Sequence, residues 1–262
     1  MGGRGARSSQ EAKEKALMDA YAKSIQPIPV DDTGVASDFS VNYNEFMAMT
    51  DDEKIDFIYE CCSHGVPVHL AQNDFQRFIY HSGLNEKPDV VDDATLDKMT
   101  GAEMFRTVND VKDQKNDISY DANQIAKQVM AGSVTRVSDT GGSAYGRGIY
   151  FASSYSESTG TYGDTVGNVK KTAVTRAKLN NNAKVISFYD ARNGYAWESR
   201  HETKLGMLLR KLDTPSAVSV YAMVKGYNVI AETFADGSSY YNVLNRNAIT
   251  MSKSIKPAGS SW

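Results

Sequence analysis

The spacing of apolar residues changes near residue 100, and this change constrains the fold more than any other feature. Over residues 42–99 the apolar side chains recur at helical spacing, whereas short apolar runs of strand length follow from residue 103 onward. Helices that precede strands, with long connections between the strands, are typical of α+β proteins. We therefore predict a helical N-terminal region packed on a mostly antiparallel sheet.

The same pattern divides the chain into three regions. Residues 1–40 are rich in Gly, Ser, Lys and Asp and hold few large apolar side chains, which favours a flexible N-terminal arm. Residues 41–100 form the predicted helical subdomain. Residues 101–262 form the predicted core, which contains the strands.

One helix of the subdomain has clear sequence signals. Thr50 and Glu53 have the spacing of a capping box, and Gly65 is a typical stop signal. Between them, four residues at helical spacing predict a buried face, namely Ile55, Ile58, Tyr59 and Cys62. Further helices are predicted over residues 75–79, 94–99, 122–130 and 201–212.

Apolar runs bounded by turn residues predict the strands of the core. These runs cover residues 103–109, 148–152, 169–178, 183–189, 218–224, 227–230 and 240–244. Asp236 and Gly237 form a strong hairpin-turn signal just before the last of them.

Charge and composition exclude several classes of protein. The formal net charge is −3 and the isoelectric point is about 5.8, so bulk attraction to nucleic acid or to an anionic membrane is not implied. A local basic cluster, for which a solvated face is the usual explanation, consists of Lys170, Lys171, Arg176 and Lys178. No apolar run approaches the roughly 20 residues of a membrane span.

Cysteine and histidine usage gives no indication of a metal site. Cys61 and Cys62 are adjacent, a spacing that suits neither a disulfide nor metal ligation, and the histidines form no zinc motif. The N-terminus lacks the apolar segment of a secretory signal. We therefore expect no metal, no membrane partner and a cytoplasmic location.

Residues 146–162 carry the most specific chemical pattern. Gly146 and Gly148 allow a backbone to approach a ligand without interference from a Cβ atom. Tyr150 follows on a predicted strand and offers a flat aromatic face. With the small hydroxyl residues that come next, the pattern is suited to hold a planar ring and to bind its amide group.

This segment resembles the nicotinamide pocket of ADP-ribosyltransferases, and it is most similar to the poly-ADP-ribose polymerase type. The similarity covers residues 146–152, and the second tyrosine of the family pattern falls at Tyr162, displaced by one residue. The resemblance implies a split sheet of the ADP-ribosyltransferase type, with NAD bound as a substrate between its halves. It assigns NAD binding to Gly148, Tyr150, Ser156, Ser158 and Tyr162.

Two further segments support the resemblance. The first core strand of family members carries an Arg or His that holds NAD, and here Arg106, followed by Thr107, stands at that position. The planar guanidinium suits phosphate or ribose oxygens. The last hairpin of family members carries a catalytic glutamate on its second strand. Aligning the apolar pair after it puts Asn242 at that position and Tyr240 two residues earlier.

The missing glutamate is the main departure from the family. Strand spacing predicts that Asn242 and Tyr240 share one face. An amide, however, lacks the charge that stabilises the cation formed as nicotinamide leaves. Glu232 and Asp236 flank the turn and supply a carboxylate if the loop folds inward. The resemblance also assigns Asp236 and Tyr240 to the region that reads the acceptor.

The function implied by the resemblance is that of an NAD-dependent ADP-ribosyltransferase, which transfers ADP-ribose from NAD to a macromolecular acceptor and releases nicotinamide. The implied catalytic residues are Arg106, Tyr150 and Asn242, with the Arg106 guanidinium and the Tyr150 ring facing each other across the dinucleotide cleft. A protein acceptor is expected, and a nucleic-acid acceptor stays open.

Two alternatives remain. In one, the chain is a catalytically degenerate protein of the same fold that binds NAD or ADP-ribose. In the other, it is a virion protein whose N-terminal arm serves assembly. The opening residues and the segment 240–249 resemble ADP-ribosyltransferase domains of bacteriophages and prophages, some of them fused to head proteins. This similarity suggests a host-cell cytoplasmic location, packaging in a virion, and association with a phage head.

Overall fold

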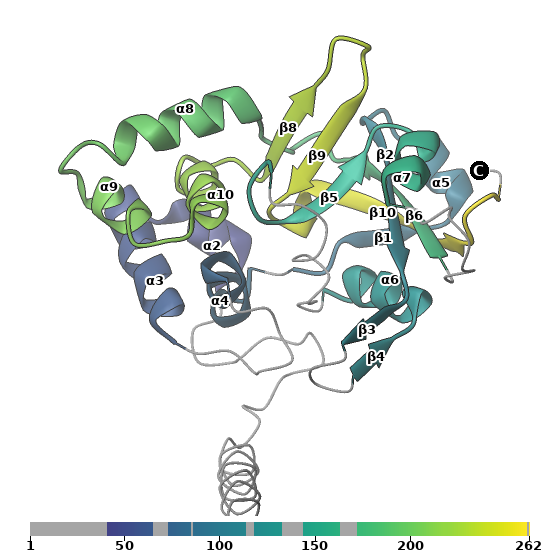
Figure 1. The fold of residues 1–262 in the computed structure, drawn as a ribbon, viewed down its shortest axis with the longest axis horizontal. Coiled ribbons are helices and arrows are strands. Elements are labelled where there is room, and N and C mark those ends of the chain that lie inside the picture. The colour runs from purple at the N-terminus through teal and green to yellow at the C-terminus, as the bar shows by residue number, and fades with distance from the viewer. Residues whose placement is uncertain are drawn as a thin grey trace, which may run out of the picture.

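The computed structural model describes a sheet with helices on both faces (Figure 1). The described residues are 41–64, 73–84, 86–113, 118–132, 144–162, 172–260 and 262. The predicted N-terminal arm, the stop signal at Gly65 and two members of the basic cluster, Lys170 and Lys171, lie outside these residues. The α+β class is confirmed.

Eight strands form the main sheet, in the order β1-β10-β6-β2-β5-β9-β8-β7. Only the two edge pairs, β1 with β10 and β7 with β8, are parallel, so the predicted antiparallel character is confirmed. In sheet order, the strands are β1 (Asp89–Val91), β10 (Ile249–Lys256), β6 (Thr172–Leu179), β2 (Glu103–Asn109), β5 (Ile149–Ala152), β9 (Ser239–Val243), β8 (Val229–Thr233) and β7 (Val185–Ser187). A separate hairpin pairs β3 (Val111–Asp113) with β4 (Ile118–Tyr120).

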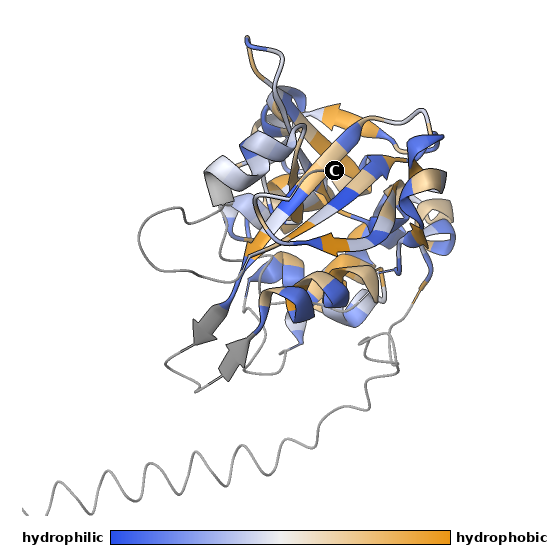
Figure 2. Ribbon diagram, turned by 90° about the vertical axis from the view of Figure 1, so that its right-hand side faces the viewer, coloured by the Kyte–Doolittle hydropathy of each residue, from blue (hydrophilic) through white to orange (hydrophobic). Residues whose placement is uncertain are grey.

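The sheet is narrowest between β2 and β5. A single residue pair, Phe105 with Ala152, joins these two strands, whereas β2 and β6 are paired over seven residues. The sheet therefore consists of two four-stranded halves that meet at one bridge. Along the strands, hydrophobic and hydrophilic residues alternate (Figure 2), as expected when the two faces have different surroundings.

Helices cover different faces of the two halves. The largest hydrophobic cluster joins α2 (Tyr43–Ala48), α3 (Asp51–Ser63) and α4 (Asp74–Ser82) to the helices that follow β7, and it reaches the sheet through Ile186 and Ile230. Those later helices are α8 (Phe188–Glu198), α9 (Lys204–Leu209) and α10 (Thr214–Val224). The N-terminal helices thus share a core with helices of the predicted region 101–262.

The other face is covered by α6 (Ala122–Met130), which contributes Val129 and Met130 to a second cluster with the inward residues of β2, β5, β6, β9 and β10. Two short helices complete the fold. They are α5 (Asp93–Asp97), beside β10, and α7 (Tyr155–Tyr162), which packs on β2 and β5.

The capping signals of the N-terminal helices act as predicted. Thr50 and Glu53 form a reciprocal capping box at the start of α3, and Ile55 and Ile58 are buried. The predicted apolar face was wrong at Tyr59, whose side chain is 49% exposed, because the helix turns Cys61 inward instead. The buried residues of α3 are Lys54, Ile55, Ile58 and Cys61, so the buried face is rotated around the helix from the predicted one.

One predicted strand is wrong and another is shorter than predicted. Residues 218–224 belong to α10, where Asp213 caps the first turn through the backbone N–H of Ser216 and Pro215 stands at the helix start. Of residues 183–189 only Val185–Ser187 is a strand, since Ser187 caps α8 immediately afterwards. Residues 218–224 have the sequence pattern of a strand because this part of α10 is buried on most sides, which removes the helical period.

We expect the aromatic contacts among α2, α3 and α4 to contribute strongly to stability. Phe78 is fully buried and its ring contacts Phe46, Phe57 and Phe75. Phe78→Ala should lower the free energy of unfolding by about 3–5 kcal/mol, measured by urea denaturation. Met207→Ala, at an exposed position of α9, should change it by less than about 0.5 kcal/mol. Equal losses in the two variants would contradict the described core.

Candidate functional site

The three segments singled out by the sequence come into direct contact. Arg106 on β2 donates from Nη1 to the carbonyl oxygen of Tyr150 on β5 at 3.0 Å. The hydroxyl groups of Thr107 on β2 and Ser158 on α7 lie 2.9 Å apart. Asn242 on β9 donates to the carbonyl oxygen of Tyr145, just before β5, at 2.9 Å. These contacts surround the bridge between the two halves of the sheet.

Arg106 and Tyr150 meet, although not as two side chains across a cleft. Strand alternation puts Arg106 on the face of Met104 and Val108, which packs toward α6, and puts the Tyr150 ring on the opposite face. The guanidinium therefore reaches the Tyr150 main chain. It also lies close to buried Arg246, whose pKa burial lowers to about 9, with the Arg106 charge acting in the same direction.

Helix α7 brings the predicted hydroxyl residues to different places. Ser158 is fully buried against Thr107, so these two hydroxyl groups form a polar pair beneath the helix. Ser156 is exposed, and its hydroxyl lies 3.2 Å from that of Ser154. Tyr162 ends the helix, and its side chain lies outside the described residues.

The space beside Gly146 and Gly148 is filled by other atoms of the protein. A Cβ atom at Gly148 would lie 2.0 Å from Asn242 Oδ1 and 2.8 Å from the carbonyl oxygen of Val243. Gly146 has a φ of +94° and a Cβ atom there would lie 2.6 Å from Ser219 Oγ of α10. The close approach predicted for a ligand is thus made by β9 and α10.

Tyr150 closes the turn that precedes its own strand. Its hydroxyl donates to the carbonyl oxygen of Gly146 at 2.6 Å and accepts from the backbone N–H of Tyr145 at 3.1 Å. The ring is buried. This arrangement fixes the turn and holds Tyr145 at the edge of the site.

A cluster of aromatic rings, which we call the aromatic rim, extends from this turn. Tyr145 makes an edge contact with Phe188 at 4.9 Å between centroids, and its ring is nearly parallel to that of Tyr240 at 6.2 Å. Phe234 packs edge-on against Tyr240 at 5.6 Å and is partly exposed. Sequence reasoning missed this rim, because its members come from four separate elements and only Tyr145 borders the motif.

Glu232 is the acidic residue at the aromatic rim. It stands on β8 directly opposite Tyr240 of β9, so both side chains point to the same face of the sheet. Burial raises the pKa of Tyr145, and the charges of Glu232 and Tyr240 raise it further. The Glu232 carboxylate is therefore close enough to act on the rings.

The other polar residues of the last hairpin have different surroundings. Asn242 is 1% exposed, and its amide donates to the carbonyl oxygens of Tyr145 and Arg147, so its side chain serves to hold the turn. Asp236 is exposed at the tip of the hairpin. Its carboxylate accepts hydrogen bonds from Ser238, and these hydrogen bonds lower its pKa. Tyr240 is half-buried within the aromatic rim.

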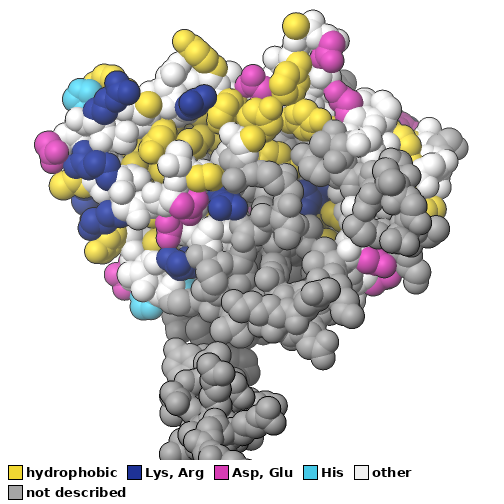
Figure 3. Space-filling view, in the orientation of Figure 1, with side chains coloured by type: hydrophobic (Ala, Val, Ile, Leu, Met, Phe, Trp, Pro, Cys, Tyr) yellow, Lys and Arg dark blue, Asp and Glu magenta, His cyan; other side chains and the backbone are white. Residues whose placement is uncertain are grey.

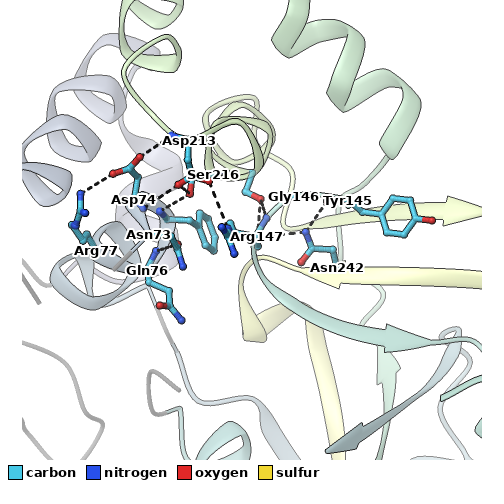
Figure 4. A network of polar contacts seen from close by, with 12 residues as sticks. Asn73, Asp74, Gln76, Arg77, Tyr145, Gly146, Arg147, Asp213, Ser216 and Asn242 are labelled. Atoms are coloured by element: carbon cyan, nitrogen blue, oxygen red, sulfur yellow. Dashed lines mark hydrogen bonds and ion pairs between the residues drawn. The ribbon is translucent and has the colours of Figure 1, made fainter. Parts of the chain in front are cut away.

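A polar network links the turn to the N-terminal helices (Figure 4). Arg147 lies 3.6 Å from the carboxylate of Asp213, and its backbone N–H donates to Ser219 Oγ at 2.7 Å. Asp213 in turn accepts from the backbone N–H of Asp74, and Asp74 pairs with Arg77. The start of α10 and the start of α4 are therefore fixed to the residue between the two glycines.

The basic cluster predicted from the sequence is engaged with the chain itself. Arg176 pairs with Asp97 at 2.5 Å and with Glu103, and Lys178 donates to the carbonyl oxygen of Met99 at 2.7 Å. These described members of the cluster thus have partners within the protein, which leaves them poorly suited to bind a polyanion.

Comparisons with protein-family models, with curated proteins and with solved structures give no match. The function is therefore argued from the site alone. None of the helices in the described ranges is long and apolar enough to cross a membrane. The same ranges hold no group of three or more His, Cys, Asp or Glu side chains placed to bind a metal ion.

The contacts of Gly148 predict a structural cost for any side chain there. Gly148→Ala should lower the free energy of unfolding by about 1–3 kcal/mol, because the new Cβ atom overlaps Asn242 and the Val243 carbonyl group. Gly160→Ala is the matched control. Nothing lies within 4 Å of a Cβ atom at this helical position, so a gain of about 0.5–1 kcal/mol is expected. Unchanged stability in Gly148→Ala would contradict the described contacts of Gly148 with Asn242 and Val243.

The pKa of Asp213 predicts a pH dependence. Burial raises this pKa, but hydrogen bonds from Ser216 and Asp74 and the charge of Arg147 outweigh it, so the pKa is lowered. The stabilisation is therefore complete above the ordinary aspartate pKa of about 3.9 and is lost as the pH falls through the lower value in the folded state. Asn also caps helices, so Asp213→Asn removes mainly the charge.

Urea denaturation of the wild-type chain and of Asp213→Asn, carried out across the acidic range, measures this effect. The wild-type protein should be more stable at neutral pH, and the difference should shrink as the pH falls below about 3.9. A difference that is constant with pH would show that the charge of Asp213 has no part in it.

Proposed function

We propose that this chain is an NAD-dependent ADP-ribosyltransferase, which transfers ADP-ribose from NAD to a macromolecular acceptor and releases nicotinamide. One observation carries the proposal. Three segments that resemble the family contact one another through Arg106 with Tyr150, Thr107 with Ser158, and Asn242 with Tyr145, pairs that are 44, 51 and 97 residues apart in the sequence. The segments lie on or beside the adjacent strands β2, β5 and β9.

In this proposal the bridge between the two halves binds the nicotinamide end of NAD. The hydroxyl groups of Thr107 and Ser158 are paired with each other beneath α7 and would support this pocket from below, while the backbone of Gly148 would bond the carboxamide. Tyr150 borders the same face and would contact the ring. Arg106 acts as a positioning residue, because its guanidinium ties β2 to the main chain of β5.

The reaction breaks the bond between ribose C1′ and the nicotinamide nitrogen. Nicotinamide leaves as a neutral molecule, and the positive charge passes to the ribose in an oxocarbenium-like transition state. The acceptor then forms a bond to C1′ and releases a proton. A fixed carboxylate stabilises the transient cation, and Glu232 is the residue that we assign to this role because it shares a face with the ring of Tyr240.

The aromatic rim supports the same chemistry. Electron-rich ring faces attract cations, and Tyr145 and Tyr240 lie beside Glu232. Phe188 and Phe234 make edge contacts with these rings and hold them in place.

A second candidate function is binding of NAD or ADP-ribose without turnover. It is favoured by Asn242, a neutral residue at the position that the resemblance gives to the catalytic glutamate, which is buried and holds the turn. The two functions differ in whether nicotinamide is released.

Incubation of the protein with NAD labelled in both the nicotinamide and adenylate parts, with and without host lysate, tests the proposal. We expect release of nicotinamide and labelling of an acceptor. Glu232→Gln should reduce the rate about 10²–10³-fold, as expected when a preorganised charge is removed from a transition state. Glu60→Gln, which makes the same change at an exposed glutamate of α3 that has no place in the site, should retain nearly the full rate.

Each outcome distinguishes the alternatives. Binding of NAD by calorimetry with no release of nicotinamide selects the binding function. Neither binding nor release rejects both. Equal rates in the Glu232 and Glu60 variants, with the fold intact by circular dichroism, reject the role of Glu232.

A further inference from the structure

Helix α8 carries a repeated pattern on its outer face. Tyr189 and Arg192 are three residues apart, and Trp197 and Arg200 repeat the same spacing eight residues later. Residues three apart on a helix are neighbours on one face. The turn after the helix continues this geometry, since the backbone N–H of Arg200 bonds to the carbonyl oxygen of Trp197. We call these four residues the α8 ridge.

The aromatic side chains of the α8 ridge are unusually exposed. Tyr189 is 72% and Trp197 58% exposed, while Ala191, on the opposite side of the helix, is fully buried in the core. The Trp197 ring lies on the ring of His201, with centroids 3.9 Å apart. One face of the indole is thus supported and the orientation of the ring is fixed in advance.

The arginines of the α8 ridge differ from the neighbouring cations. Lys204 and Arg210 pair with Asp56 and Glu202. By contrast, the ion pairs found among the described residues include no carboxylate for Arg192 or Arg200. Figure 3 shows Lys and Arg side chains interspersed with hydrophobic ones over this part of the surface.

The acidic residues within the repeat are occupied elsewhere. The carboxylate of Asp190 accepts a hydrogen bond from the hydroxyl of Ser187, and Ser187 caps the start of the helix. Glu198 accepts from Thr203 and lies 3.7 Å from Lys225. Neither carboxylate forms an ion pair with Arg192 or Arg200 among the described residues.

We infer that the α8 ridge binds single-stranded nucleic acid. Arg192 and Arg200 bind phosphates, and Tyr189 and Trp197 stack on bases, which is the combination that unpaired strands require. At 1.5 Å per residue, the two aromatic residues are about 12 Å apart along the helix, so they contact bases that are not adjacent. An acidic peptide satisfies the arginines but offers no flat partner for the exposed rings.

The α8 ridge begins at the candidate site. Phe188, the residue before Tyr189, packs against Tyr145 of the aromatic rim. A strand bound along α8 therefore ends beside the rim, and we assign single-stranded nucleic acid as the acceptor. This assignment of the acceptor rests on the proposed transferase function, whereas binding to the ridge does not.

Fluorescence anisotropy with a labelled oligothymidylate of about 20 nucleotides and the full chain tests the inference. Binding should weaken as salt rises. Trp197→Ala should weaken it about tenfold or more, and Arg192→Ala with Arg200→Ala should do the same and also reduce the salt dependence. The control variant, Lys204→Ala with Arg210→Ala, removes two cations that already have partners and should leave affinity nearly unchanged.

The fold of each variant is checked by circular dichroism. Absence of binding by the wild-type chain at low salt overturns the inference. It is also overturned if polyglutamate competes as well as the oligonucleotide and Trp197→Ala has no effect, which indicates an acidic peptide partner. Oligonucleotide binding without release of nicotinamide from NAD supports nucleic-acid binding by the α8 ridge and argues against the transferase function. Release of nicotinamide without oligonucleotide binding supports the transferase function and overturns nucleic-acid binding by the ridge.

Discussion

The fold and the candidate site both depend on the bridge between β2 and β5. Backbone pairing there is limited to Phe105 and Ala152, so side chains must hold the two halves of the sheet in register. Arg106 does so through the carbonyl oxygen of Tyr150, and Thr107 does so through Ser158. Polar groups in a buried position are costly unless they are paired, which explains why these residues form specific contacts.

Because the bridge is narrow, the turn before β5 is fixed by side chains of β9 and α10 and not by β2. Asn242 holds the carbonyl groups of this turn from β9, and Ser219 and Asp213 hold Arg147 from α10. The network continues to Asp74 at the start of α4 (Figure 4). The helices before residue 100 are therefore coupled to the geometry of the site, although no residue of theirs resembles a functional motif.

The accuracy of the sequence-based predictions follows from the range of the interactions involved. Residues 103–109 and 122–130 form the strand and the helix expected of them, because alternation, capping and stop signals are local. Residues 218–224 were mistaken for a strand, since a helix buried on most sides has no apolar stripe. The contact between Arg106 and Tyr150 agrees with the predicted proximity, but the face of each side chain depends on register, which only the assembled sheet defines.

The same limit explains why Glu232 was considered only as a residue flanking a turn. Its relation to Tyr240 is a cross-strand pairing set by the β8–β9 register, and no motif in the sequence marks it. Electrostatic stabilisation of a cation depends on the distance and surroundings of a carboxylate, and not on the strand that carries it. A neutral Asn242 therefore does not by itself argue against catalysis, because in this register the charge lies one strand away, beside the rings of Tyr145 and Tyr240. Asn242 holds the turn, and under the proposed function Glu232 would supply the charge, so two residues would share what a single glutamate combines.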